Sequence, residues 1–126
     1  MLVSILHRAT GDGLAVFGLG TLLWWLASLA SGPEAYASFI GWMWADVTAL
    51  QWAAADLIPS LVKVLLKLLL IGLSWAFFNH MSSGIRHFVL DTGAGYELNT
   101  NKRFSVVSIV SGVVLTAVFW AAILLN

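Results

Sequence analysis

Three long stretches without Asp, Glu, Lys or Arg dominate the hydrophobic pattern of the chain. They cover 21, 18 and 23 residues, at positions 13–33, 68–85 and 104–126. A helix needs about 20 apolar residues to cross the hydrocarbon core of a bilayer, so each stretch is long enough for one span. The pattern therefore predicts an all-α integral membrane protein with an up-down-up bundle of three transmembrane helices, at approximately residues 12–32, 60–89 and 104–125.

A tryptophan-rich segment, residues 35–58, separates the first two predicted spans. It contains Trp42, Trp44 and Trp52 and is interrupted by Asp46 and Asp56. Tryptophan is enriched at the membrane interface, where its ring lies in lipid and its N–H meets water. A fourth span would bury Asp46 at a cost of about 2.5–3.5 kcal/mol. We therefore expect an interfacial helix or a re-entrant segment here.

The composition agrees with a membrane protein. The 126 residues are 60% hydrophobic and 10% charged, whereas soluble domains carry about a quarter charged residues. The length predicts a single membrane-anchor domain over residues 1–126. The net charge is zero, so no basic field indicates nucleic acid as a partner, and the absence of cysteine excludes thiolate chemistry within this sequence.

The distribution of Lys and Arg indicates the orientation. With three spans, the N-terminal segment and the second loop share one side of the membrane. That side carries four basic residues and the other side two: Arg8, Arg86, Lys102 and Arg103 against Lys63 and Lys67. The positive-inside rule then favours a cytoplasmic N-terminus. The first uncharged stretch is too long for a cleaved signal peptide and no Arg/Ser-rich presequence precedes it, so we expect a bacterial inner membrane.

Two polar clusters are candidates for chemistry. The first, Ser4-Ile-Leu-His-Arg-Ala-Thr-Gly11, precedes the first uncharged stretch. The second, His80-Met-Ser-Ser-Gly-Ile-Arg-His87, closes the second span and is followed by Asp91-Thr92-Gly93. Because consecutive spans run in opposite directions, both clusters are expected at the same face of the membrane.

His80 is the deepest ionisable residue of the second cluster. It lies ten residues, or about 15 Å along a helix, before Leu90. An imidazole at such depth is usually functional. Ser83 and Gly84 share its helix face and would leave room for a flat macrocycle. Helix packing through small residues explains the same pattern, so a haem ligand and a packed histidine both remain open.

The spacing of the histidines limits how a haem could be held. His87 follows His80 by seven residues, about 10.5 Å along the same face. One straight helix therefore cannot supply both axial ligands of one iron. His7 is the only other histidine in the sequence and is expected near the surface. A partner chain is therefore the expected donor of the second ligand.

Cationic side chains surround the histidines at this face. Arg8 and Arg86 can bind carboxylates in bidentate geometry and, with His7 and His87, would suit haem propionates. Anchoring to anionic lipid is the alternative explanation for the arginines. Asp91 could pair with either arginine, or it is an ordinary acid at a helix end.

Both clusters resemble the signatures of a known family. Ser4–Gly11 is similar to the pattern S-I-x-H-R-x-[ST]-G of the cytochrome b subunit of succinate dehydrogenase. The segment beginning at His80 resembles that family's second signature, H-x-x-x-G-x-R-H-x-x-x-D, and its ending, Asp91-Thr92-Gly93, is most similar to the alphaproteobacterial and mitochondrial branch. Gly32-Pro33-Glu34-Ala35-Tyr36 also resembles the family.

The resemblance implies a four-subunit complex, succinate:ubiquinone oxidoreductase. A flavoprotein oxidises succinate, an iron–sulfur subunit carries the electrons, and two membrane anchor subunits share one haem b and form the ubiquinone site. It implies that His80 is an axial ligand of the haem iron, opposite a histidine of the second anchor subunit. It further implies that Ser4 and Arg8 line the quinone site and that His7 and Arg8 lie near a haem propionate. Arg86 is a further candidate for haem contact, and His87 and Asp91 are candidates for proton relay or support.

Three alternatives remain open from the sequence. The same architecture could serve as a quinol:fumarate reductase anchor, since residues do not fix the direction of electron flow. A non-redox membrane subunit could use a buried histidine for proton relay. The chain could also be a structural anchor whose haem is dispensable for turnover.

Overall fold

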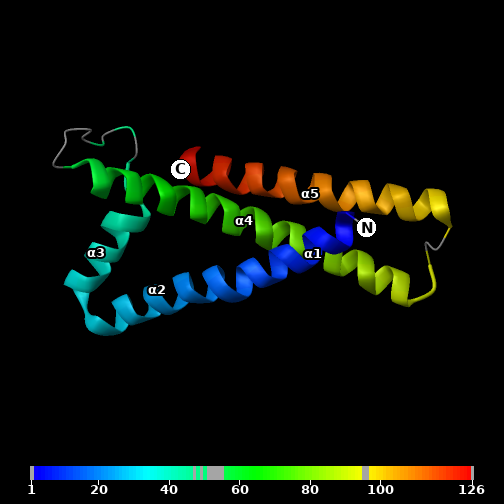
Figure 1. The fold of residues 1–126 in the computed structure, drawn as a ribbon, viewed down its shortest axis with the longest axis horizontal. Coiled ribbons are helices and arrows are strands. Elements are labelled where there is room, and N and C mark those ends of the chain that lie inside the picture. Colours follow the sequence, from blue (N-terminus) through cyan, green and yellow to red (C-terminus); the bar gives the residue numbers. More distant parts are fainter. Residues whose placement is uncertain (1, 47, 49, 51–55, 95–96, 126) are drawn as a thin grey trace. The chain divides into compact units, whose positions relative to one another are not determined.

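A computed structural model describes residues 2–46, 48, 50, 56–94 and 97–125, and all regular elements within them are helices. In chain order they are α1 (Leu2–Gly13), the π-helical turn η1 (Leu14–Gly18), α2 (Leu19–Ser31), α3 (Pro33–Met43), α4 (Leu57–Asp91) and α5 (Leu98–Leu125) (Figure 1). The all-α prediction is confirmed.

Three helical stretches are long and apolar enough to cross a membrane. They run over Leu2–Ser31, Leu57–Asp91 and Leu98–Leu125, with 30, 35 and 28 residues. The prediction of three helices that can cross a membrane is confirmed. The first helix begins ten residues earlier than expected, at Leu2, so the whole first polar cluster is helical. Its polar side chains are tolerated there because several of them bond to neighbouring groups, as described below.

The chain divides into two compact units, Met1–Val16 with Leu73–Asn126, and Phe17–Gly72. Each is described by itself. The expectation that residues 1–126 form a single membrane-anchor domain stays a prediction.

The unit of residues 17–72 is built around a sharp turn between α2 and α3. Gly32 has φ 106°, a conformation that favours glycine, and Pro33 follows it in the first turn of α3. The turn lays α3 against α2, where the rings of Trp24 and Phe39 meet edge to face with centroids 5.0 Å apart. With 11 residues, α3 is about 16 Å long, too short to cross a bilayer.

Two tryptophans at the end of α3 contact the start of α4 in the same unit. Lys63 Nζ lies 5.6 Å from the ring centroid of Trp42, and Lys67 Nζ lies 4.7 Å from that of Trp44. Helix α3 ends at Met43, and the described residues between it and the start of α4 at Leu57 are not helical. The expected helix is therefore present, and its interfacial placement stays a prediction. Trp52 lies outside the described residues.

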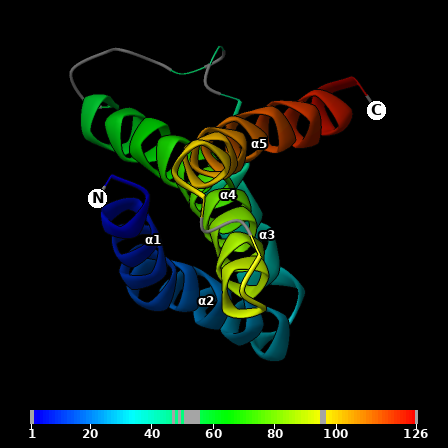
Figure 2. The ribbon, with the colours of Figure 1, turned by 90° about the vertical axis from the view of Figure 1, so that its right-hand side faces the viewer.

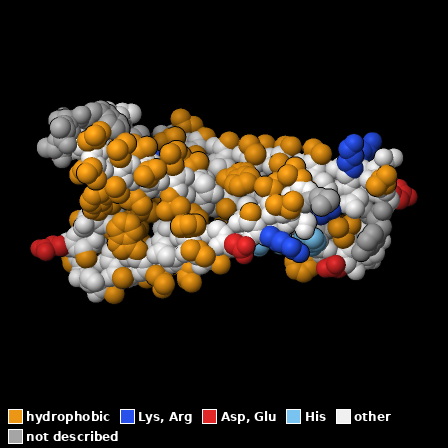
Figure 3. All heavy atoms as spheres, viewed as in Figure 1, with side chains coloured by type: hydrophobic (Ala, Val, Ile, Leu, Met, Phe, Trp, Pro, Cys, Tyr) orange, Lys and Arg blue, Asp and Glu red, His pale blue; other side chains and the backbone are white. Residues whose placement is uncertain are grey.

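The interior of the other unit is small and polar rather than large and apolar. Its buried polar residues are Thr10, Asn79, Ser83, Ser108 and Thr116. Large apolar side chains point outward instead: Phe88 is 75% exposed and Val118 60%. Figure 3 shows apolar side chains over much of the visible surface. This distribution is the reverse of a soluble core and is typical of helices that pack in lipid.

Helix α5 runs back alongside the second half of α4, and the two approach closely (Figures 1 and 2). Ser108, Gly112 and Thr116 form a buried stripe at four-residue spacing on α5. A Cβ built on Gly112 would lie 3.0 Å from both Cα and Cβ of Asn79 on α4. Small residues at four-residue spacing allow helix backbones to approach in this way.

Candidate functional site

Helices α1 and α4 bring the three histidines of the chain together. The rings of His7 and His80 are stacked, with centroids 4.1 Å apart and an interplanar angle of 9°. The ring of His87 lies 5.2 Å from that of His7, tilted by 59°. The two polar clusters thus contact each other, as the antiparallel arrangement of the spans predicts.

The environment of His80 Nδ1 fixes which ring nitrogen carries the proton. Nδ1 lies 3.1 Å from the backbone carbonyl oxygen of His7. A carbonyl can only accept, so Nδ1–H is the donor. The Thr10 hydroxyl, 3.5 Å from Nδ1, donates its own proton to Leu6 O at 2.7 Å and so can accept a second, weaker bond. In the neutral ring, Nε2 then keeps its lone pair, as a metal-binding histidine requires.

Ser83 on α4 forms a hydrogen bond to α1 and does not leave room beside His80. Its Oγ lies 2.6 Å from His7 Nδ1 and 3.1 Å from His80 O, and the residue is 1% exposed. The expectation that Ser83 helps to make room for a macrocycle is therefore wrong. At Gly84, on the same side as His80, a Cβ would meet no atom of another element within 4 Å. Gly84 therefore leaves open space on this side of α4.

The stacking of His7 on His80 limits what the two rings can bind together. Parallel rings with centroids 4.1 Å apart do not direct their nitrogens at each other across a shared ligand. Within the described residues, no group of three or more His, Cys, Asp or Glu is arranged to hold a bare metal ion. The Nε2 lone pair of His80 is therefore the candidate ligand of this cluster, and His7 is not turned toward it.

The other candidate residues on α1 lie on an accessible face. Ser4 and Arg8 are one helical turn apart, which places them on the same side of α1, and both are exposed. Neither side chain has a hydrogen bond or ion pair to another described residue. Both are therefore available to a molecule that approaches this face.

The end of α4 carries two further candidates. His87 and Asp91 are exposed and one turn apart, on the helix face that also holds His80. Asp91 is the last residue of α4. Neither arginine forms an ion pair with it, so the predicted pairing of Asp91 with Arg8 or Arg86 is absent within the described residues.

Arg86 points away from the histidines, toward α5. Its Nη2 donates a hydrogen bond to Asn101 Oδ1. Its Nε is buried and has no hydrogen-bond partner among the described residues. Arg86 is thus separated from the group of residues that surrounds His80.

Comparison with known proteins places this arrangement in a family. The model of the succinate dehydrogenase/fumarate reductase transmembrane subunit family matches residues 1–120. The chain is 30% identical over 114 residues to the "succinate dehydrogenase cytochrome b556 subunit" of Paracoccus denitrificans, covering 90% of this chain and 73% of the relative. It is also 30% identical over 118 residues to the protein of the same name from Rickettsia felis, covering 94% and 77%. No solved structure matches the chain.

The chain belongs to the succinate dehydrogenase/fumarate reductase transmembrane subunit family. The family assignment confirms the resemblance read from the two motifs, including its alphaproteobacterial relatives. It also agrees with the three helices that are apolar enough to span a membrane.

Two residues that contact His80 are absent from the candidates predicted from the sequence. Thr10 accepts from His80, and a Cβ built on Gly11 would lie 3.0 Å from His80 Cε1. Both follow His7 at the three- and four-residue spacing that places side chains on one helix face. That spacing was the available signal, and it was obscured because the first helix was expected to begin after this motif.

Proposed function

We propose that this chain is the haem-ligating membrane anchor subunit of a succinate:ubiquinone oxidoreductase, respiratory complex II. Family membership and the names of the relatives support a subunit of this oxidoreductase. The observation that carries the haem assignment is the hydrogen bond from His80 Nδ1–H to His7 O, which leaves Nε2 available for iron.

The residues around His80 suit a haem b. The carbonyl oxygen of His7 orients the imidazole and raises its basicity, and Gly84 leaves space beside it. When bound, the haem supplies one-electron transfer. A histidine of the second anchor subunit would hold the haem together with His80, because the ring of His7 is stacked on His80 and is not directed toward it. His7 and Arg8 are proposed to contact a propionate.

Ser4 and Arg8 are proposed to bind the ubiquinone ring. Reduction of the quinone consumes two electrons and two protons. The hydroxyl of Ser4 can donate a hydrogen bond to one carbonyl oxygen. The guanidinium of Arg8, one turn along α1, can stabilise negative charge that develops on oxygen before protonation. Their exposure agrees with a site that is completed by another subunit.

His87 and Asp91 are proposed to deliver the protons. They are exposed at the end of α4 and lie one turn apart, so a proton can pass between them through one water. Succinate oxidation itself belongs to the flavoprotein, and electrons arrive through the iron–sulfur subunit. We further propose a bacterial inner membrane location with a cytoplasmic N-terminus, from the distribution of Lys and Arg.

A difference spectrum tests the haem assignment. The detergent-purified complex that contains this chain is reduced with succinate and compared with the air-oxidised sample. We expect a sharp low-spin b-type band that disappears in His80→Ala. The matched control is His87→Ala, which removes an imidazole about 10.5 Å further along the same helix and is expected to keep the band.

Two results would count against this function. Absence of the band after dithionite reduction would remove the haem. An unchanged band in His80→Ala would show that a residue other than His80 binds the haem iron.

A further inference from the structure

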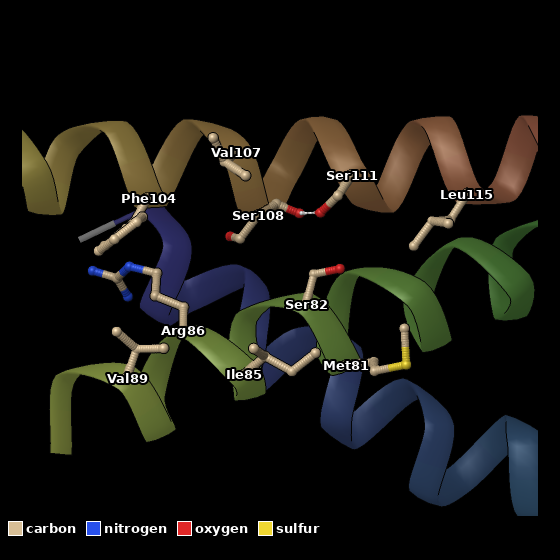
Figure 4. Close-up of a pocket in the computed structure, with 10 residues that line it drawn as sticks. All are labelled: Met81, Ser82, Ile85, Arg86, Val89, Phe104, Val107, Ser108, Ser111 and Leu115. Carbon is tan, nitrogen blue, oxygen red and sulfur yellow. Dashed lines mark hydrogen bonds between the residues drawn. The ribbon is translucent and has the colours of Figure 1, made fainter. Parts of the chain in front are cut away.

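A hollow between α4 and α5 lies outside the proposed haem and quinone residues. Its volume is about 350 Å³, within the range of ligand sites. The walls are mainly apolar and are formed on α4 by Ile85 and Val89, and on α5 by Phe104, Val107 and Leu115 (Figure 4). Side chains of the two helices point toward each other across it. We call it the α4–α5 groove.

The length of the groove matches one leaflet of a bilayer. From Phe104 to Leu115 is eleven residues, or about 16 Å along α5. Half of the hydrocarbon core is about 15 Å thick. An apolar chain that fills the groove would therefore reach from the interface to near the middle of the membrane, as a lipid acyl chain does.

A cation with an unused donor stands at one end of the groove. Arg86 lines it near the end of α4, and its buried Nε has no hydrogen-bond partner among the described residues. The side-chain oxygen of Asn101 accepts from Nη2, which leaves Nε unpaired. A guanidinium carries five N–H donors and binds phosphate in a bidentate fashion. Leaving a buried donor without a partner is costly, so a phosphate oxygen at this position would be favoured.

Further positive charge lies at the same end of α5. Lys102 and Arg103 are exposed and line a second hollow that shares Val107 with the groove. None of the described residues that line either hollow is acidic. Asp91 and Glu97 stand nearby in the chain without lining them, so the basic residues outnumber the acidic ones by one. The charge favours a headgroup with net negative charge over a zwitterionic one.

We propose that the α4–α5 groove binds an anionic phospholipid, with its phosphate on Arg86 and one acyl chain along the groove. The inference is independent of the proposed haem and quinone functions, since it uses a different side of α4. It assigns a lipid phosphate to Arg86 in place of the haem propionate suggested by the sequence. The side chain of Arg86 points toward α5, which agrees with this ligand.

Native mass spectrometry of the delipidated, detergent-purified complex tests this proposal. The complex is titrated with dioleoylphosphatidylglycerol or dioleoylphosphatidylcholine, and bound lipid is counted. We expect phosphatidylglycerol to bind more tightly. Arg86→Gln should weaken that binding about tenfold, because a charged hydrogen-bond donor is lost. The matched control is Lys63→Gln, which removes one cation more than twenty residues away along α4 and should change binding little.

A second variant separates lipid binding from loss of charge. Ser111→Phe fills the groove beside Leu115 and leaves every cation in place. It should reduce binding of phosphatidylglycerol as strongly as Arg86→Gln does. Circular dichroism and gel filtration show that each variant is folded.

Three outcomes would overturn the proposal. Equal losses of phosphatidylglycerol binding in Arg86→Gln and Lys63→Gln would show that binding depends only on the total charge of the protein. Equal affinities for the two lipids, unchanged by Ser111→Phe, would exclude the groove as a lipid site. A photo-crosslinker at position 111 that labels only another protein subunit would show that a partner helix occupies the groove.

Discussion

Gly11 lies so close to His80 that a Cβ at Gly11 would stand 3.0 Å from Cε1 and 3.4 Å from Nδ1 of the imidazole. The ring has little freedom to retreat, because Nδ1 is bonded to His7 O and the ring of His7 is stacked against it. The absence of a side chain at Gly11 therefore leaves the space that the imidazole of His80, the proposed haem ligand, occupies.

Gly11→Ala is expected to displace the His80 ring and weaken haem binding. Changes to groups that orient a metal-binding histidine typically cost 10- to 100-fold in affinity, and we expect a loss of about that size. The matched control is Gly13→Ala, where a built Cβ meets nothing within 4 Å. Haem content per complex, measured by pyridine haemochrome, checks the prediction. Equal haem loss in both variants would show that the effect is not local to His80.

Thr10→Val should shift the haem potential without removing the haem. The substitution keeps the shape of the side chain and removes the oxygen 3.5 Å from His80 Nδ1, while the shorter bond to His7 O remains. The loss in haem affinity should therefore stay below about tenfold. Redox titration of the b-type band measures the shift, and Thr10→Ser should restore the original potential. A potential that is the same in all three proteins would remove Thr10 from the site.

Gly112→Leu is expected to destabilise the packing of α4 against α5. Its side chain would enter the space occupied by the backbone and Cβ of Asn79, where a Cβ alone would lie at 3.0 Å. Overpacking of this kind costs about 1–3 kcal/mol or more. Gly72→Leu is the matched control, since a Cβ there meets nothing within 4 Å. Thermal unfolding of the purified complex compares the two variants. Similar unfolding midpoints would contradict the close approach of Gly112 to Asn79.

Arg8→Ala should lower quinone reduction while electron transfer from succinate to a soluble artificial acceptor continues. Loss of one donor that stabilises developing negative charge typically reduces turnover about 10²-fold or more. Both assays are made on the same preparation, so the soluble acceptor serves as the internal control. Equal loss of the two activities would assign Arg8 to assembly rather than to the quinone.

The number of spans and the meeting of the two motifs could be read from the sequence. Charge-free stretches near the length of a bilayer crossing predict spans without any tertiary information. Two consecutive spans must run in opposite directions, so Ser4–Gly11 and His80–His87 had to meet at one face. The contacts between His7, Ser83 and His80 bear this out.

Which neighbour each side chain meets could not be read in the same way. Helical periodicity places Ser83 on the His80 side of α4, but α1 determines that it bonds to His7 and closes the space there. The direction of Arg86 depends on Asn101, which lies fifteen residues later on another helix. The π-helical turn at Leu14–Gly18 contains no charge or proline that would indicate it, and it lies inside the first predicted span.

The unbroken course of α4 has an electrical consequence. Lys67 and Arg86 are nineteen residues apart, about 29 Å along the helix, which matches the thickness of the hydrocarbon core. His80 lies six residues before Arg86, about 9 Å inside that boundary. In the proposed orientation, a charge that moves from the cytoplasmic face to a group bound at His80 crosses about a third of the membrane potential. That step is worth about 0.7 kcal/mol per 100 mV, so the occupancy of this site by electrons would respond to the energisation of the membrane.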